Sequence, residues 1–135
     1  MRYMDLASKL GVTEGTVRNR MQRLTEQGAL KVVRIIDQTK IGYRLNVWIG
    51  VRCRPGTFGR MADELARLHP IRYVGACTGT FDVIAEAIFL SESEMYAFLE
   101  SDIPTIDGII STESSMVLRM VKLGYEWELR EEEYA

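Results

Sequence analysis

The stretch from Leu6 to Leu30 most constrains what this chain can fold into, because apolar residues recur at helical spacing on both sides of a glycine. Gly11 ends the first apolar segment, as glycine does just beyond a helix C-terminus. Thr13 can cap a second helix by accepting a hydrogen bond from an early backbone amide, and Gly28 closes that helix. The apolar stripe of the second helix contains Val17, Met21 and Leu24. The pattern predicts a helix, a tight turn and a second helix, which is the helix-turn-helix arrangement.

The opposite face of the second helix is polar and cationic. In a helix-turn-helix the second helix enters the DNA major groove, and its first residues reach the base edges. We therefore expect base contacts from the residues that open this helix and phosphate contacts from two arginines farther along it. The candidate base-contacting residues are Thr13, Glu14, Thr16, Arg18 and Asn19, and the candidate phosphate-contacting residues are Arg20 and Arg23.

Charge is divided unevenly along the chain, although the formal net charge of the whole is only −2. Residues 1–44 hold nine Lys or Arg against four acids, a net charge of +5. Residues 45–135 hold eight basic residues against 15 acids, a net charge of −7. A basic segment joined to an acidic one indicates a DNA-facing part and a part that avoids the phosphate backbone. Chance fluctuation between short segments is the alternative explanation.

A complete three-helix or winged DNA-binding unit needs a further helix before Leu6, to cover the apolar faces of the pair. Only five residues precede Leu6, too few to form that helix. The helix then lies upstream of this sequence, has been removed, or is absent in life. Two short helices with an uncovered stripe are marginal alone, because packing supplies most helix stability. We therefore expect weakened or absent specific DNA binding by this chain.

The rest of the chain alternates between strand and helix patterns. The β-branched segment 31–36 predicts a strand before a polar turn, and we place a domain boundary near residue 44. Later segments predict strands at 45–53, 71–78, 81–90 and 109–122 and helices at 58–69 and 91–102, with Ser91 and Glu94 at capping-box spacing. The order βαββαβ predicts an α+β chain, with a ferredoxin-like domain at 45–135 behind a partial helix-turn-helix domain at 1–44. Residues 124–135 fit either a short added strand or an acidic tail.

A ferredoxin-like sheet carries both helices on one face, so its other face is bare. Alternate positions of a strand point to opposite faces of the sheet. The predicted strands nevertheless carry apolar residues at the positions that would point to the bare face, namely Trp48, Ile84, Ile88, Leu90, Met116, Leu118 and Met120. Exposed to water, these residues would form a large apolar patch. We expect a second copy to cover this face, giving a homodimer that assembles further. Scattered exposed apolar residues are the alternative.

Three sequence runs resemble the Lrp/AsnC transcription regulators, the feast/famine proteins of bacteria and archaea. The first is G-V-T-E-G-T-V-R-N-R-M-Q-R-L-T-E-Q-G-A-L at 11–30, which is similar to the DNA-reading half of the family. The second, V-G-A-C-T-G-T-F-D-V-I at 74–84, is similar to its Gly-x-x-Asp turn, and the third, S-T-E-S-S-M-V-L at 111–118, to its Thr-x-Thr strand. The resemblance covers nearly the whole chain and implies a DNA-binding regulator with an effector-binding and oligomerisation domain. It also implies an N-terminal helix that has no counterpart here.

The turn from Gly79 to Asp82 is the predicted effector site. A tight glycine turn frees backbone amides for a carboxylate, and a nearby acid accepts an ammonium group, so a free α-amino acid would fit. Carried over from the family by position, the candidate effector-binding residues are Gly75, Thr78, Gly79, Thr80, Asp82, Thr112 and Ser114. Thr80 and Phe81 replace charged and tyrosyl residues often found in the family, and Ser114 replaces a threonine. A plain hairpin turn with a rim charge is the alternative.

Several classes of function find no support in the residues. We find no phosphate-binding glycine loop, no nucleophile elbow and no histidine positioned by a carboxylate, so we expect no catalytic residues and no enzyme. Cys53 and Cys77 fit small core residues better than a metal or redox pair, and His69 is the one histidine, so we expect no metal and no cofactor. No apolar run approaches the roughly 20 residues of a membrane span, and no secretory signal opens the sequence, which favours a cytoplasmic location.

The sequence predicts a DNA-binding transcription regulator of Lrp/AsnC type, whose oligomeric state responds to a small effector, an amino acid. A different class of function would apply if the missing helix is absent in life. The chain would then be a small-molecule-binding assembly protein that tunes a full-length relative through mixed oligomers. A ferredoxin-like enzyme or enzyme subunit is the third reading.

Overall fold

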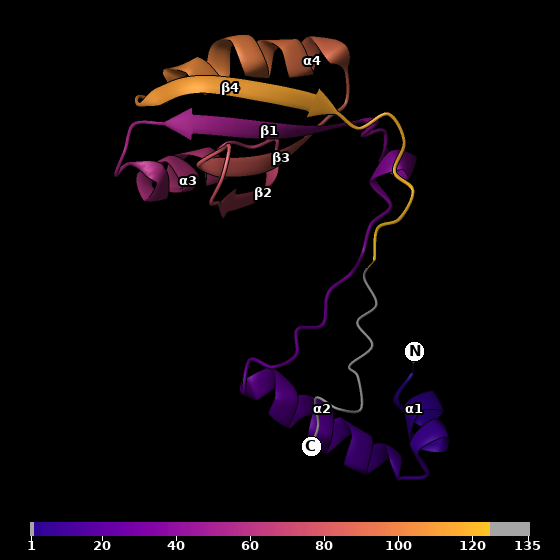
Figure 1. The fold of residues 1–135 in the computed structure, drawn as a ribbon. Helices are drawn as coiled ribbons and strands as arrows, with labels where there is room; N and C mark the ends of the chain where they lie inside the picture. The colour runs from indigo at the N-terminus through magenta and orange to yellow at the C-terminus, as the bar shows by residue number, and fades with distance from the viewer. Residues whose placement is uncertain (1, 125–135) are drawn as a thin grey trace. The chain divides into compact units, whose positions relative to one another are not determined.

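The computed structural model of the chain describes residues 2–124. The chain divides into two compact units, Met1–Ile36 and Asp37–Ala135 (Figure 1). Each unit has its own internal packing, so the structural basis of each is given separately below. The predicted acidic segment 124–135 lies, apart from its first residue, outside the described residues.

The first unit contains two helices, α1 (Tyr3–Leu10) and α2 (Glu14–Glu26). Gly11 follows α1 with a left-handed φ of 63°, a conformation that glycine adopts without the steric cost of a Cβ atom. The Thr13 hydroxyl accepts a hydrogen bond from the Thr16 amide at 3.2 Å and so caps α2. These contacts confirm the predicted helix, tight turn and second helix.

The two helices of the first unit bury little apolar surface. Ala7 and Val17 are buried where α1 and α2 meet. Leu10 is 63% exposed and Leu24 is 42% exposed, although both belong to the predicted apolar faces. The pair therefore leaves part of its apolar stripe uncovered.

The strand predicted at residues 31–36 is absent from the structure. The segment has no regular secondary structure and pairs with no strand among the described residues. Its β-branched side chains are exposed, namely Val32, Val33, Ile35 and Ile36. The prediction was wrong because β propensity favours an extended backbone, whereas a stable strand also needs a neighbour to complete its hydrogen bonds. A short 3₁₀ helix, η1 (Gln38–Ile41), lies where the polar turn is expected.

The second unit has the predicted order βαββαβ. Its elements are β1 (Leu45–Cys53), α3 (Phe58–Ala66), β2 (Ile71–Ala76), β3 (Val83–Phe89), α4 (Glu92–Ala97), a π-helical turn η2 (Phe98–Asp102), a 3₁₀ turn η3 (Ile103–Thr105) and β4 (Ile109–Met116). The four strands form an antiparallel sheet in the order β2-β3-β1-β4. This arrangement confirms the α+β class and the ferredoxin-like plan. The last strand ends at Met116 rather than at residue 122.

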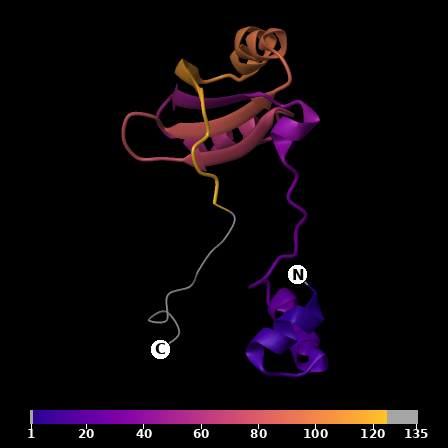
Figure 2. The same ribbon diagram turned by 90° about the vertical axis from the view of Figure 1, so that its right-hand side faces the viewer.

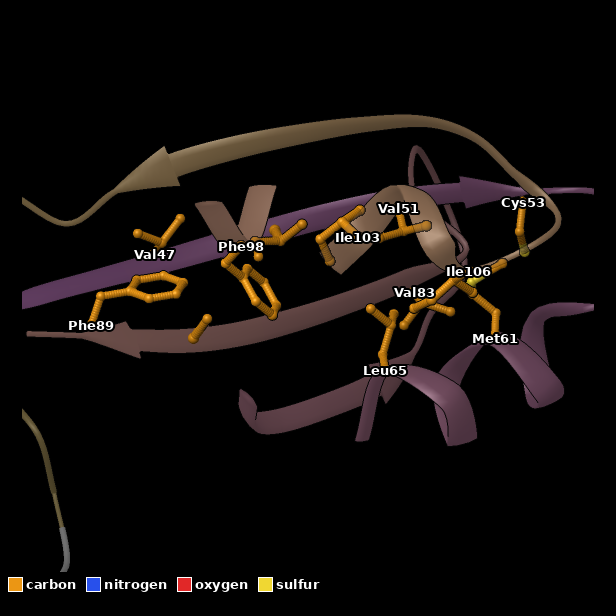
Figure 3. Close-up of a cluster of buried hydrophobic side chains, with 12 residues drawn as sticks. Val47, Val51, Cys53, Met61, Leu65, Val83, Phe89, Phe98, Ile103 and Ile106 are labelled. Atoms are coloured by element: carbon orange, nitrogen blue, oxygen red, sulfur yellow. The ribbon is translucent and has the colours of Figure 1, made fainter. Parts of the chain in front are cut away.

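The core of the second unit lies on one face of this sheet. Alternate residues of β1 and β3 point into it, and α3, η2 and η3 pack their side chains against that face (Figure 3). The largest fully buried side chains are Phe89, Phe98, Ile49, Met61, Leu65, Val47, Val51 and Val83. Phe89 and Phe98 contact each other with ring centroids 5.3 Å apart. The helix-covered face is therefore a continuous apolar core.

The opposite side of the sheet, here called the open face, carries the intervening residues. Directly paired residues of an antiparallel sheet share a face. The register pairs Trp48 with Glu86 and Ser115, and Gly50 with Ile84 and Glu113, so these residues all lie on the open face. Trp48 remains 40% exposed and lies 5.9 Å, ring centroid to centroid, from Tyr73 of β2.

Four residues assigned to this face from the sequence lie elsewhere. Leu90 follows the end of β3, and Leu118 and Met120 follow the end of β4. The fourth is Met116, which belongs to β4 but lies on the other side of the sheet. Met116 pairs with Val47, so it lies on the core side of the sheet and not beside Trp48. Its side chain is 45% exposed because β4 is an edge strand. The parity count failed because the register of β4 against β1 shifts at Arg52 and Cys53, which alternation within one strand cannot reveal.

Replacing Ile49 by alanine should lower the free energy of unfolding of the second unit by about 2–5 kcal/mol, because its side chain is fully buried. Replacing Ile110 by alanine is the matched control. It is also a strand isoleucine but is 63% exposed, so its loss should cost no more than about 0.5 kcal/mol. Urea unfolding followed by circular dichroism measures both values. Equal costs would contradict the assignment of the core.

Candidate functional site

The candidate DNA-binding residues all lie at the start or on the surface of α2. Thr13 is its cap, and Glu14 and Thr16 in the first turn are half-buried. The exposed members are Arg18, Asn19, Arg20 and Arg23. The helix therefore presents its cations and its amide side chain to solvent, and it buries only Val17.

The arginines of α2 differ in whether they form an ion pair. Arg18 donates to Glu14 at 2.8 Å, an exposed i,i+4 ion pair whose contribution to stability is small, about 0.3–0.5 kcal/mol. Arg20 and Arg23 make no ion pair within residues 2–124 and border a shallow hollow with Leu24 and Gln27. A phosphate could therefore bind Arg20 and Arg23 without displacing a carboxylate.

The connection between β2 and β3 projects from one end of the sheet and contains the predicted effector turn (Figure 2). Gly79 has a φ of 105°, and Thr78, Gly79 and Thr80 are exposed. The Cys77 amide donates to the Asp82 carbonyl at 2.9 Å and closes the turn. The structure thus brings Thr78, Gly79, Thr80 and Asp82 together in one short loop.

Asp82 ties this turn to β1. Its amide donates to the Val51 carbonyl at 3.0 Å, and its Oδ2 atom accepts a hydrogen bond from the Cys53 amide at 2.9 Å. The Cys53 amide lies where the register of β1 against β4 shifts, so the carboxylate satisfies a donor at that irregularity. Asp82 therefore has a structural role, and one of its two carboxylate oxygens is already engaged.

Three residues outside the predicted set also hold the turn. Arg52 Nε donates to the Thr80 carbonyl at 2.9 Å, and the guanidinium carbon lies 6.0 Å from the centroid of the Phe81 ring. The Phe81 ring lies against Gly50, where a Cβ atom would come within 2.6 Å of it. The sequence analysis missed Arg52 and Gly50, although both lie on the same face of β1 as Trp48.

Gly75 has a similar covering contact. A Cβ atom at Gly75 would lie 2.6 Å from the Tyr73 hydroxyl oxygen, so the Tyr73 side chain folds over this glycine on the open face. Aromatic rings thus cover a glycine in β1 and another in β2. The candidate effector residue Gly75 is in contact with protein and is not a free surface.

The two predicted residues of β4 point away from the open face. Thr112 pairs with Val51 and Ser114 with Ile49, which places both on the core side at the exposed edge of the sheet. The alternate residues Glu113 and Ser115 lie on the open face. A hollow of about 210 Å³ opens there, lined by Trp48, Gly50, Phe81, Ile84, Glu113 and Ser115. The structure therefore separates the predicted β4 residues from this hollow.

Neither a metal-binding cluster nor a membrane-spanning helix occurs in the described part of the chain. Within residues 2–124, no group of three or more His, Cys, Asp or Glu side chains could hold a metal ion. In the same part of the chain, no helix is long and apolar enough to cross a membrane. Cys53 is buried and Cys77 is half-buried, and both are free thiols.

Comparison with known proteins identifies the class. The family model for the Lrp/AsnC ligand binding domain matches residues 46–127. An HTH-type transcriptional regulator of Pyrococcus abyssi is 31% identical over 126 residues, which cover 93% of this chain and 80% of the relative. The regulator Ptr1 of Methanocaldococcus jannaschii is 28% identical over 123 residues, covering 90% of this chain and 83% of that protein.

Solved structures agree in fold. AsnC of E. coli superposes with a TM-score of 0.84 at 24% identity, covering 92% of this chain and 85% of that one. The transcriptional regulator NMB0573 of Neisseria meningitidis, solved in complex with L-Met, gives 0.86 at 17% identity, covering 95% and 85%. The class is therefore that of HTH-type transcriptional regulators, which are not enzymes. Within it, this chain belongs to the Lrp/AsnC family.

Replacing Asp82 by alanine should lower the free energy of unfolding of the second unit by about 1–3 kcal/mol, because the amide of the buried Cys53 loses its acceptor. Asp82→Asn is the matched control, since its amide oxygen can still accept that hydrogen bond. Chemical denaturation should therefore give a smaller loss for asparagine than for alanine. Equal losses would show that the carboxylate charge, and not the hydrogen bond, matters.

Proposed function

We propose that this chain is a DNA-binding transcription regulator whose oligomeric state responds to a small effector, an amino acid. The proposal depends most on α2, which presents arginines outward from a capped N-terminus. Membership of the Lrp/AsnC family adds a ligand-binding domain behind it. The regulator would act in the cytoplasm, where its DNA is found.

The DNA-binding step would use α2 in the major groove. Thr13, Thr16 and Asn19 offer short polar groups near the start of the helix, where base edges come within reach. Arg20 and Arg23 would neutralise phosphates, since neither is engaged by a carboxylate among the described residues. Arg18 and Glu14 would open their ion pair at small cost.

The assembly step would use the open face. The side chains of Trp48 and Tyr73 are 40% and 52% exposed. Ile84 and Ile88, on the same face of β3, are only half-buried. A second copy laid sheet against sheet would remove this apolar surface from water. The same surface could instead consist of scattered apolar residues, and the two cases differ in the mass of the particle in solution.

The effector step would use the turn from Thr78 to Asp82. Support comes from Gly79, an exposed residue with a φ of 105°, and from NMB0573, a structural neighbour that was solved in complex with L-Met. Gly75, Thr112 and Ser114 complete the proposed set. Gly75 is covered by Tyr73, and the two β4 residues lie on the core side of the sheet edge. An effector that touched them all would have to reach around the edge of the sheet.

The double variant Arg20→Ala/Arg23→Ala should bind DNA more weakly and with a flatter salt dependence. Each lost phosphate contact lowers the slope of log K against log salt by about 0.9. Fluorescence anisotropy with a mixed-sequence DNA duplex, titrated at several salt concentrations, measures this slope. Arg67→Ala/Arg72→Ala, which removes two exposed arginines of the second unit, is the matched control and should change it little.

Absence of binding by the parent chain at low salt would contradict the DNA-binding step. It would favour the second candidate, an assembly protein that binds a small molecule and tunes a full-length relative. The exposed Leu10 and Leu24 favour that candidate, because α1 and α2 leave their apolar stripe uncovered.

A cognate amino acid should raise the melting temperature and change the sedimentation profile together. At about 100 times its dissociation constant, a ligand stabilises the folded state by about 2.7 kcal/mol. Differential scanning fluorimetry against the standard amino acids, followed by sedimentation velocity, provides the measurement. Thr78→Val should weaken the response, whereas Thr105→Val, distant in sequence from the turn, should leave it intact. A flat panel would contradict the sensor.

A further inference from the structure

An acid lies in the middle of the open face, among apolar side chains. Glu86 belongs to β3, which pairs with β1 on one side and with β2 on the other. The register places it beside Trp48 and Tyr73, whose ring centroids lie 5.9 Å apart. Ile84 and Ile88 flank it on the same face of β3. Glu86 is half-buried in these surroundings before any second copy approaches.

The side-chain amide of Asn46 is the partner of this carboxylate. Its Nδ2 atom donates to Glu86 Oε1 at 2.5 Å, which links β1 to β3 on the open face. Its other polar atom, Oδ1, is buried and has no hydrogen-bond partner within residues 2–124. A buried acceptor without a donor is uncommon in folded proteins and lowers their stability. The pair of Asn46 and Glu86 therefore lacks one donor.

Glu86 has no cationic partner in the described part of the chain. None of the salt bridges found there includes it. Arg52, on the same face of β1, donates through Nε to the Thr80 carbonyl instead. The titratable side chains on the four strands, besides Glu86, are Arg52, Cys53 on the core side, Arg72, Tyr73 and Glu113. The carboxylate is therefore held by a neutral amide alone.

Closing the open face against a second copy changes this balance. Removing a carboxylate from water without a cation is costly, whereas a protonated carboxyl group is far less costly to bury. A protonated Glu86 would also supply the donor that Asn46 Oδ1 lacks. Its O–H group would donate to Oδ1 while its carbonyl oxygen still accepts from Nδ2. Protonation therefore removes a charge and satisfies a buried acceptor in one step.

We propose that Glu86 takes up a proton when two copies associate through the open face, so that acidification strengthens the dimer. The inference rests on the assembly step proposed above and adds a regulator, the proton, to that step. In the dimer, Glu86 and Asn46 form a neutral pair joined by two parallel hydrogen bonds. Because the dimer binds more protons than two separate copies, its dissociation constant falls as the pH falls.

Sedimentation equilibrium of the full chain at about pH 7.5, 6.5 and 5.5 tests this linkage. The dissociation constant of the parent dimer should fall at least about tenfold from the highest pH to the lowest. Circular dichroism at each pH reports whether the chain stays folded. His69 titrates in the same range, but its contribution is common to the parent and to variants of Glu86. The pH dependence of the parent is a test that requires no variant.

Glu86→Gln is the decisive variant, because glutamine has the shape of the protonated acid and does not titrate. Its carbonyl oxygen can accept from Asn46 Nδ2, and its amide can donate to Oδ1. The variant should associate at about pH 7.5 at least about tenfold more tightly than the parent and vary less than about threefold with pH. Glu113→Gln is the matched control. Glu113 is an exposed open-face acid on the edge strand β4, so this variant should keep the pH dependence of the parent.

The outcomes separate this inference from the function on which it rests. A parent dimer that is insensitive to pH would overturn the proposal and leave the assembly step intact. Parent-like pH dependence in Glu86→Gln, or its loss in Glu113→Gln, would also overturn it. If neither the parent nor Glu86→Gln associates at any pH, the proposal and the assembly step both fail. The DNA titration and the amino-acid panel do not involve Glu86, so their results stand apart.

Discussion

The second unit depends on β1, which, like β3, pairs with a neighbour on both sides within the sheet. Its partners β3 and β4 fix which of its side chains enter the core and which reach the open face. Val47, Ile49 and Val51 are almost completely buried, whereas Trp48 between them is 40% exposed. One strand thus contributes both to the packing that stabilises the unit and to the surface on which its proposed interactions take place.

Much of this arrangement was predictable because it follows from local chemistry. The caps at Thr13 and Ser91 form as their side chains require, since a hydroxyl near a helix start satisfies a free amide wherever the helix lies. The order βαββαβ follows from the alternation of apolar periods. Glu94 shows the limit of such rules, because its carboxylate accepts from the Leu90 amide, one residue before the cap.

What the sequence could not provide depends on pairing between distant segments. Residues 31–36 have strong β propensity but no neighbouring strand among the described residues, so propensity alone misled. Thr112 and Ser114 were chosen by their place in a motif, whereas the register of β4 decides which face they occupy. Arg52 was overlooked because its partner, the Thr80 carbonyl, is a backbone atom that no residue pattern marks.

The contact between Phe81 and Gly50 has a mechanical consequence. The ring belongs to the same loop as Thr80 and Asp82, yet it rests on the strand whose even-numbered side chains make up the open face. A displacement of the loop would move the ring off Gly50 and leave the backbone there uncovered, since glycine has no side chain to replace it. The position of the loop and the shape of the open face around Gly50 are therefore coupled through the Phe81 ring.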